Sequence, residues 1–205
     1  MVIIMSNLEV FKQQNKHVIN HINRYEPTII EFLNKLENKN LINKNYPREV
    51  RTNLKKFGII GNAAMTLANR SDIKKKLYYL VAICNAYQVN SELLRKHLLI
   101  VVNWDEFTNL NKSNATLGTL LSRLSNKGLE ETDFINHLSK SKNIRNSIAH
   151  CTFFYEDNQI HFYKNIYDNS PIKMDLESFR EESIKLNILT AELLIIYFDM
   201  HPPKI

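Results

Sequence analysis

Three residues late in this chain, Arg145, Asn146 and His150, could carry out chemistry on a phosphate ester. The guanidinium of an arginine stays cationic at neutral pH and holds a phosphate through a planar fork of donors. An imidazole titrates near neutrality and can take up or release a proton. With Arg145 on the scissile phosphate, His150 moving protons and Asn146 orienting the imidazole or bonding the phosphate, a phosphodiester can be cleaved without a metal ion.

A structural role for the same residues is the alternative, because Arg-x4-His is short enough to occur by chance. In that alternative, Asn146 caps a helix that restarts after an irregular turn at Ser141–Asn143, and His150 anchors the helix end to the segment that follows. Exposed Arg145 and His150 side chains favour catalysis. A buried His150 bonded to a backbone carbonyl favours the structural role.

The spacing also bears on the oligomeric state. On an ideal helix, residues five apart are separated by about 140° around the axis, so Arg145 and His150 do not share one narrow face. Contributions from two chains would relax this constraint. We therefore expect a two-fold dimer in which the motifs of both chains meet in one cleft.

The composition favours helices in a single domain spanning residues 1–205. Only 4 Gly and 5 Pro occur in 205 residues, which leaves little material for a turn-rich β-protein. The apolar runs at 98–102 and 193–198 are far shorter than the roughly 18 residues of a membrane-spanning helix, and no export signal is recognisable. The widely separated Cys84 and Cys151 suit a reducing compartment. We expect a soluble cytoplasmic protein.

The charge pattern indicates a polyanionic partner and neither metal nor cofactor. The formal net charge is +6, which favours a partner such as RNA. No phosphate-binding glycine loop and no carboxylate cluster occurs. His150, Cys151 and His161 lack the spacing of a zinc site, and His17 and His21 lack the intervening glutamate of a metalloprotease motif.

Hydrophobic periodicity places the motif at the end of a helix that precedes a β-hairpin. A helix from Glu130 or Thr132 leads into the motif, and a β-prone stretch follows it at about 151–164. The aromatic side chains of this hairpin are expected to form a small core under the bundle, and base stacking is their alternative role. The other predicted helices cover about 8–25, a segment from Pro27 to Leu36, 47–69, 71–102 with a possible kink at 90–92, 117–126 and a final helix at about 175–199.

A helix that ends in Arg-Asn-x-x-x-His, late in a helical chain, resembles the HEPN superfamily (higher eukaryotes and prokaryotes nucleotide-binding). The likeness is greatest to its abortive-infection and toxin-type members. Arg145, Asn146 and His150 match the family's motif position by position, and residues 116–120 resemble a helix opening found upstream of it. Thr152 departs from those members in which an antitoxin modifies a tyrosine two residues after the histidine.

The resemblance implies a HEPN-like helical bundle with a small hairpin after the motif. It also implies a metal-independent endoribonuclease that is usually a homodimer with a composite site, and a toxin or antiviral defence role with an antitoxin or defence-system partner. Cleavage would leave 2′,3′-cyclic phosphate ends. A non-catalytic helical module that binds nucleic acid or a protein stays open as the alternative function.

Overall fold

The computed structural model describes residues 9–15, 25–44, 48–68, 76–108, 110–130, 132–165 and 167–202. Within them the chain is mainly α-helical with one small sheet, as the sequence predicts. The helix expected over 8–25 is described only at 9–15, where 9–14 are helical, and His17 and His21 lie outside the described residues. The remaining helices are α3 (Glu26–Asn38), α4 (Arg48–Ala68), α5 (Lys76–Val101), α6 (Leu117–Leu124), α7 (Asp133–Ala149) and α8 (Leu176–Met200).

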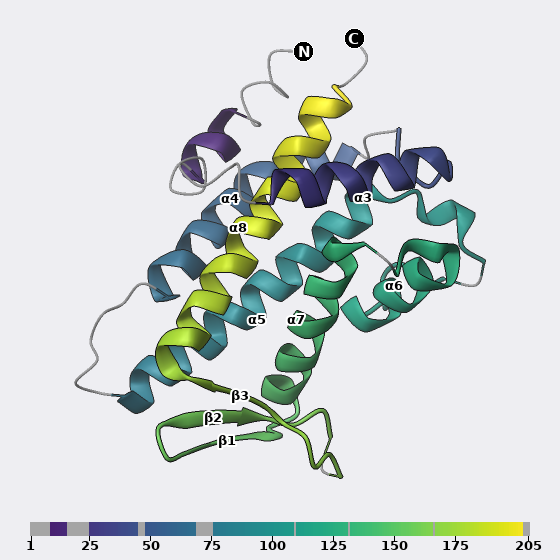
Figure 1. Cartoon of the computed structure of the whole chain (residues 1–205). Helices are drawn as coiled ribbons and strands as arrows, with labels where there is room; N and C mark the ends of the chain where they lie inside the picture. The colour runs from purple at the N-terminus through teal and green to yellow at the C-terminus, as the bar shows by residue number, and fades with distance from the viewer. Residues whose placement is uncertain are drawn as a thin grey trace.

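The two longest helices, α5 and α8, pack along each other and form the centre of the bundle. Helix α4 packs against both, and α7 packs against α5 and α6. Helix α3 crosses the end of the bundle that lies away from the sheet, and the sheet lies below the end of α7 and the start of α8 (Figure 1). No helix within the described ranges has the length and apolarity that a membrane span requires.

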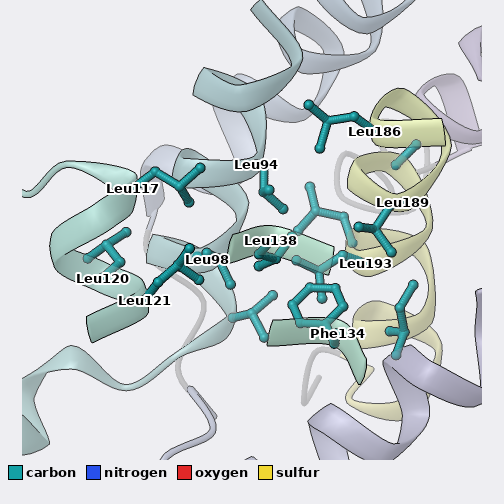
Figure 2. Close-up of a cluster of buried hydrophobic side chains, with 14 of the residues drawn as sticks. Leu94, Leu98, Leu117, Leu120, Leu121, Phe134, Leu138, Leu186, Leu189 and Leu193 are labelled. Carbon is teal, nitrogen blue, oxygen red and sulfur yellow. The ribbon is translucent and has the colours of Figure 1, made fainter. Parts of the chain in front are cut away.

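A cluster of leucines joins four helices into one core. The labelled side chains in Figure 2 come from α5 (Leu94, Leu98), α6 (Leu117, Leu120, Leu121), α7 (Phe134, Leu138) and α8 (Leu186, Leu189, Leu193). Trp104, in the 3₁₀ turn Trp104–Glu106 that follows α5, is 2% exposed and donates its indole N–H to the Leu98 carbonyl at 2.9 Å. Burial of this apolar surface holds α7 against α5 and α6.

Helix α5 is one helix from Lys76 to Val101, so no new helix begins at 90–92, where the sequence allows a kink or a fresh cap. Asn90 and Ser91 are buried, and both have hydrogen-bond partners. The Asn90 amide donates to the Ser183 carbonyl on α8 at 3.2 Å, and the Asn187 amide donates to the Asn90 side-chain oxygen at 2.9 Å. The Ser91 hydroxyl donates one turn back to Tyr87 at 2.9 Å. Polar side chains that bond across to a second helix, or within their own, do not need to break the helix.

Helix α7 is continuous as well, so the irregular turn expected at Ser141–Asn143 is wrong. Thr132 caps the helix by accepting a hydrogen bond from the Ile135 amide at 3.3 Å, as expected for this position. Ser141 is buried, and its two neighbours are half-buried in the middle of the helix. Packing against α3, α5 and α6 overrides the weak helix propensity of these residues.

The expected hairpin is present, but it belongs to a three-stranded antiparallel sheet. Strands β1 (Phe153–Glu156) and β2 (Gln159–Phe162) pair with Phe153 opposite Phe162 and Tyr155 opposite Ile160, so these four residues share one face of the sheet. The third strand, β3 (Ile172–Asp175), pairs with β2 and was not predicted. Its four residues follow Pro171 and run directly into α8. A stretch this short shows too little alternation of apolar and polar residues to be distinguished from the start of a helix.

Candidate functional site

The Arg-Asn-x-x-x-His motif occupies the last turns of α7. His150 is the C-cap residue, and its backbone N–H donates to the Asn146 carbonyl at 2.9 Å. The N–H of Cys151 bonds to the Ile148 carbonyl at 3.3 Å, and the N–H of Thr152 bonds to the Ser147 carbonyl at 2.9 Å. This pair of bonds is the Schellman arrangement, which satisfies the free carbonyls of a helix end.

Cys151 occupies the position of that motif where glycine is usual. Its φ of 53° lies in the left-handed region, which costs an L-residue roughly 1–2 kcal/mol. The chain therefore reverses direction immediately after His150 and enters β1. As a result, His150 lies at a corner of the fold between α7 and the sheet.

Ser147 fixes the sheet to the helix from within the motif. Its side chain is fully buried, and its hydroxyl donates to the Thr152 carbonyl at 2.8 Å and accepts from the Tyr163 N–H at 3.1 Å. The Thr152 hydroxyl donates to the Tyr163 carbonyl at 2.9 Å. The anchoring role that the sequence-based alternative gave to His150 thus belongs to Ser147 and Thr152. A serine near the end of an otherwise apolar helix face indicates that its hydroxyl has a hydrogen-bond partner, but it does not identify that partner.

The side chain of His150 is exposed, and those of Arg145 and Asn146 are half-buried. The Arg145 guanidinium donates to the Asn146 side-chain oxygen at 3.3 Å. No hydrogen bond joins the His150 imidazole to another residue of the described ranges. The structure therefore brings the Arg145 and Asn146 side chains into contact, and it places His150 at the C-cap of the same helix without a hydrogen bond to either.

Arg145 lines an open cavity of about 240 Å³ at the start of α6. The second arginine of the cavity, Arg95, is engaged: it donates to both carboxylate oxygens of Glu92, at 2.7 and 2.9 Å, and to the Ala115 carbonyl at 3.1 Å. Within the described part of the chain, no carboxylate forms an ion pair with Arg145. Arg145 is therefore the cation of this cavity that can accept an anionic ligand. The remaining lining residues are Ser91, Ser113, Asn114, Thr116 and Leu117.

A larger cavity, about 430 Å³, lies between the start of α3, the middle of α7 and α8. It also contains cationic side chains, Lys140 and Lys185, but both contact the same Glu182 oxygen, at 3.2 and 3.5 Å. His137, on the same helix as the motif, packs edge-on against Tyr25 with 5.9 Å between ring centroids. Both lysines here share an ion pair with one carboxylate, whereas no carboxylate of the described residues pairs with Arg145.

No family model, curated protein or solved structure matches this chain. Within the residues that the structure describes, no three His, Cys, Asp or Glu side chains lie together where they could hold a metal ion. The resemblance to the HEPN superfamily therefore rests on Arg145, Asn146 and His150 and on their place at the end of a helix before a small sheet.

Proposed function

We propose that this chain is a metal-independent endoribonuclease of HEPN type, acting in the cytoplasm as a toxin or abortive-infection effector in antiviral defence. The observation that carries the proposal is the exposure of His150 at the end of α7. An imidazole held by packing would be buried and bonded, whereas one that exchanges protons with a substrate must be reachable.

The chemistry assigns one role to each motif residue. His150 takes the proton of the ribose 2′-hydroxyl, or gives a proton to the leaving 5′-oxygen. The 2′-oxygen attacks the phosphorus, and the bond from phosphorus to the 5′-oxygen breaks, which leaves a 2′,3′-cyclic phosphate and a 5′-hydroxyl. Arg145 stabilises the negative charge that develops on the phosphate. Asn146, which bonds to Arg145, orients the guanidinium.

The site is complete only in a dimer under this proposal. Arg145 opens onto the cavity beside α6, and His150 is at the corner before β1. A second copy related by a two-fold axis would place the His150 of one chain near the Arg145 of the other. An antitoxin or another component of the same defence system would then control the dimer by covering this cleft.

The test is cleavage of a labelled RNA by the purified chain with and without excess EDTA. We expect cleavage to persist in chelator and to leave 2′,3′-cyclic phosphate ends, identified by mass spectrometry. A reaction that stops in EDTA and returns with magnesium would replace this mechanism with a metal-dependent one. RNA binding without any cleavage would favour the non-catalytic helical module.

A further inference from the structure

The three-stranded sheet has two faces of different character, because successive side chains on a strand point to opposite sides. On the inner face, Ile160 and Phe162 of β2 are buried, and the Phe162 ring lies 5.0 Å from Phe179 of α8. This face forms the small core under the bundle that the sequence predicts. On the outer face, Phe154, His161 and Lys173 stand opposite one another and form a row across all three strands.

On the outer face, the ring of Phe154 contacts two other rings, that of His161 in the same row and that of Tyr163, which follows β2. The Phe154 ring lies 4.9 Å from the His161 ring and 5.4 Å from the Tyr163 ring, and it is within 22° of parallel to the latter. Phe154 is nevertheless 45% exposed. An apolar ring kept in water beside two amphipathic rings offers flat surface to a planar ligand.

The charges around these rings suit a polyanion that crosses the sheet on the side of α7. Lys173 continues the row, and Lys164 follows β2 at the same end of the sheet; both are exposed. The acidic residues Glu156 and Asp175 belong to the row at the opposite end, next to the β1–β2 turn. The two lysines therefore lie toward the end of the sheet where β1 begins. Glu156 and Asp175 lie at the opposite end, and Asp168 accepts the backbone N–H of Lys164 at 2.9 Å.

We propose that Phe154, His161, Tyr163 and Lys173 form a platform on which bases of single-stranded RNA stack. Every base has a flat face, so aromatic rings bordered by lysines bind single strands with little sequence preference. The proposal takes the identity of the ligand from the proposed ribonuclease function and extends that function to the way in which substrate is held.

The platform is joined directly to the motif. The backbone N–H of Tyr163 bonds both to the Ser147 hydroxyl, at 3.1 Å, and to the Thr152 carbonyl, at 3.0 Å. Ser147 stands between Arg145 and His150 on α7. These hydrogen bonds therefore fix the position of Tyr163 relative to the helix end that carries His150.

The experiment measures binding separately from cleavage. A fluorescein-labelled oligouridylate of twelve nucleotides is titrated with full-length His150→Ala protein, and anisotropy is recorded. We expect Phe154→Ala in this background to raise Kd at least about fivefold, since loss of one stacked base costs that much or more. Phe154→Trp should keep the affinity, because the larger ring still stacks. Tyr78→Ala, which removes a ring that is 74% exposed on α5, is the matched control and should leave Kd unchanged.

Lys173→Ala should act through charge and not through stacking. We expect it to weaken binding and to lower the slope of log Kd against log salt by about 0.7, the value for one phosphate contact on a single strand. Phe154→Ala should leave that slope unchanged. Because both side chains are exposed, circular dichroism and thermal melting should show both variants folded as the parent protein is.

Four outcomes would overturn the platform. The first is an unchanged Kd for Phe154→Ala, and the second is an equal loss of affinity for Phe154→Ala and Tyr78→Ala. The third is equal affinity of the His150→Ala protein for an RNA duplex of the same length. The fourth is that Phe154→Ala converts the dimer to a monomer and leaves the RNA affinity unchanged. The last would assign the face to a second copy of the chain. Failure of the ribonuclease proposal is distinct: the platform would still bind RNA, and wild type would not cleave it.

Discussion

Two histidines of this chain, His97 within α5 and His150 at the end of α7, carry the same side chain in opposite surroundings. His97 is 1% exposed and packs between the rings of Phe11 and Phe57, with centroids at 6.3 and 5.3 Å. Its Nδ1–H donates to the Thr190 carbonyl on α8 at 2.7 Å. Burial lowers the pKa of His97 to about 4, so its ring is neutral at physiological pH. His150 is exposed and follows the last residue of its helix.

The contrast separates structural from chemical use of an imidazole. His97 cannot exchange a proton with a substrate, because neither water nor a ligand reaches it, and its one bond joins α5 to α8. His150 is exposed at a helix end, where a ligand can reach its ring. The same residue type therefore stabilises the fold in one place and is available for catalysis in the other, which makes the two sites matched controls for each other.

The largest expected effect is on cleavage. His150→Ala and Arg145→Ala should each lower the RNA cleavage rate by about 10²-fold or more, since one removes the proton carrier and the other the charge stabiliser. Both variants should keep the free energy of unfolding within about 1–2 kcal/mol of the wild type. Single-turnover cleavage and urea titrations at equal soluble protein provide the two measurements. A stably folded His150→Ala protein with full activity would refute the nuclease assignment.

Two controls sharpen this comparison. His137→Ala removes another exposed histidine of α7, in the larger cavity, and should leave cleavage intact. Mixing the two inactive variants should restore part of the activity, because a mixed dimer contains one site with Arg145 from one chain and His150 from the other. No recovery in a mixture shown by light scattering to contain dimers would place both groups on the same chain.

The second expected effect is on stability. His97→Ala should lower the free energy of unfolding by about 2–4 kcal/mol, because it leaves a cavity between Phe11 and Phe57 and deprives the buried Thr190 carbonyl of its donor. Urea unfolding followed by circular dichroism measures the change. Cleavage per folded molecule should not change, and a selective loss of activity would assign His97 a role in the site.

The smallest expected effect is the pH dependence of stability. Between pH 4 and 6.5 the unfolded chain protonates His97 and the folded chain does not, so this histidine makes stability rise with pH. Burial raises the pKa of Glu192 from 4.5 to about 8, so between these values the folded carboxyl keeps a proton that the unfolded one loses, and stability falls as pH rises. Above pH 6.5, Glu192 is the only one of these two groups that still changes the free energy of unfolding with pH.

Stability should therefore change little from pH 4.5 to 6.5 and then decline towards pH 8, by at most about 1.4 kcal/mol per pH unit. Glu192→Gln keeps the shape of the side chain and removes its titration, so the decline should disappear in this variant. Thermal melting across the pH range measures both proteins. An unchanged decline in Glu192→Gln would assign it to another group.

Much of the fold could be predicted from the sequence, because apolar periodicity and end signals agree. The bounds of α4, α6, α7 and α8, the cap at Thr132 and the presence of the hairpin follow from such local patterns. Gly128, with a φ of 72°, ends the π-helical turn Ser125–Leu129 where a helix stop is expected. The motif at the end of α7 and the exposure of His150 agree with the catalytic reading of the residues.

The rest depended on partners that are distant in sequence. Asn90 does not break α5, because Ser183 and Asn187 of α8 satisfy its side chain. Residues 172–175 form strand β3 because they pair with the free edge of β2, and their own sequence does not specify a strand. Ser147 could not be recognised as the link to the sheet, since its partner Tyr163 is sixteen residues away and donates through its backbone. Every residue except proline has a backbone N–H, so the residue type at position 163 does not reveal this donor.

The hydrogen bonds of Ser147 also restrict which residues can occupy the positions between Arg145 and His150. Written as Arg-x4-His, the motif fixes two positions and leaves four open. Here Ser147 must be small and carry a hydroxyl, and Ile148 is buried and must be apolar, so only Asn146 and Ala149 stay open to replacement without loss of packing. A pattern that demands a small hydroxyl residue and then an apolar one before the histidine would meet far fewer chance matches. In this fold, the residues that distinguish such a helix end from a chance match lie between the arginine and the histidine.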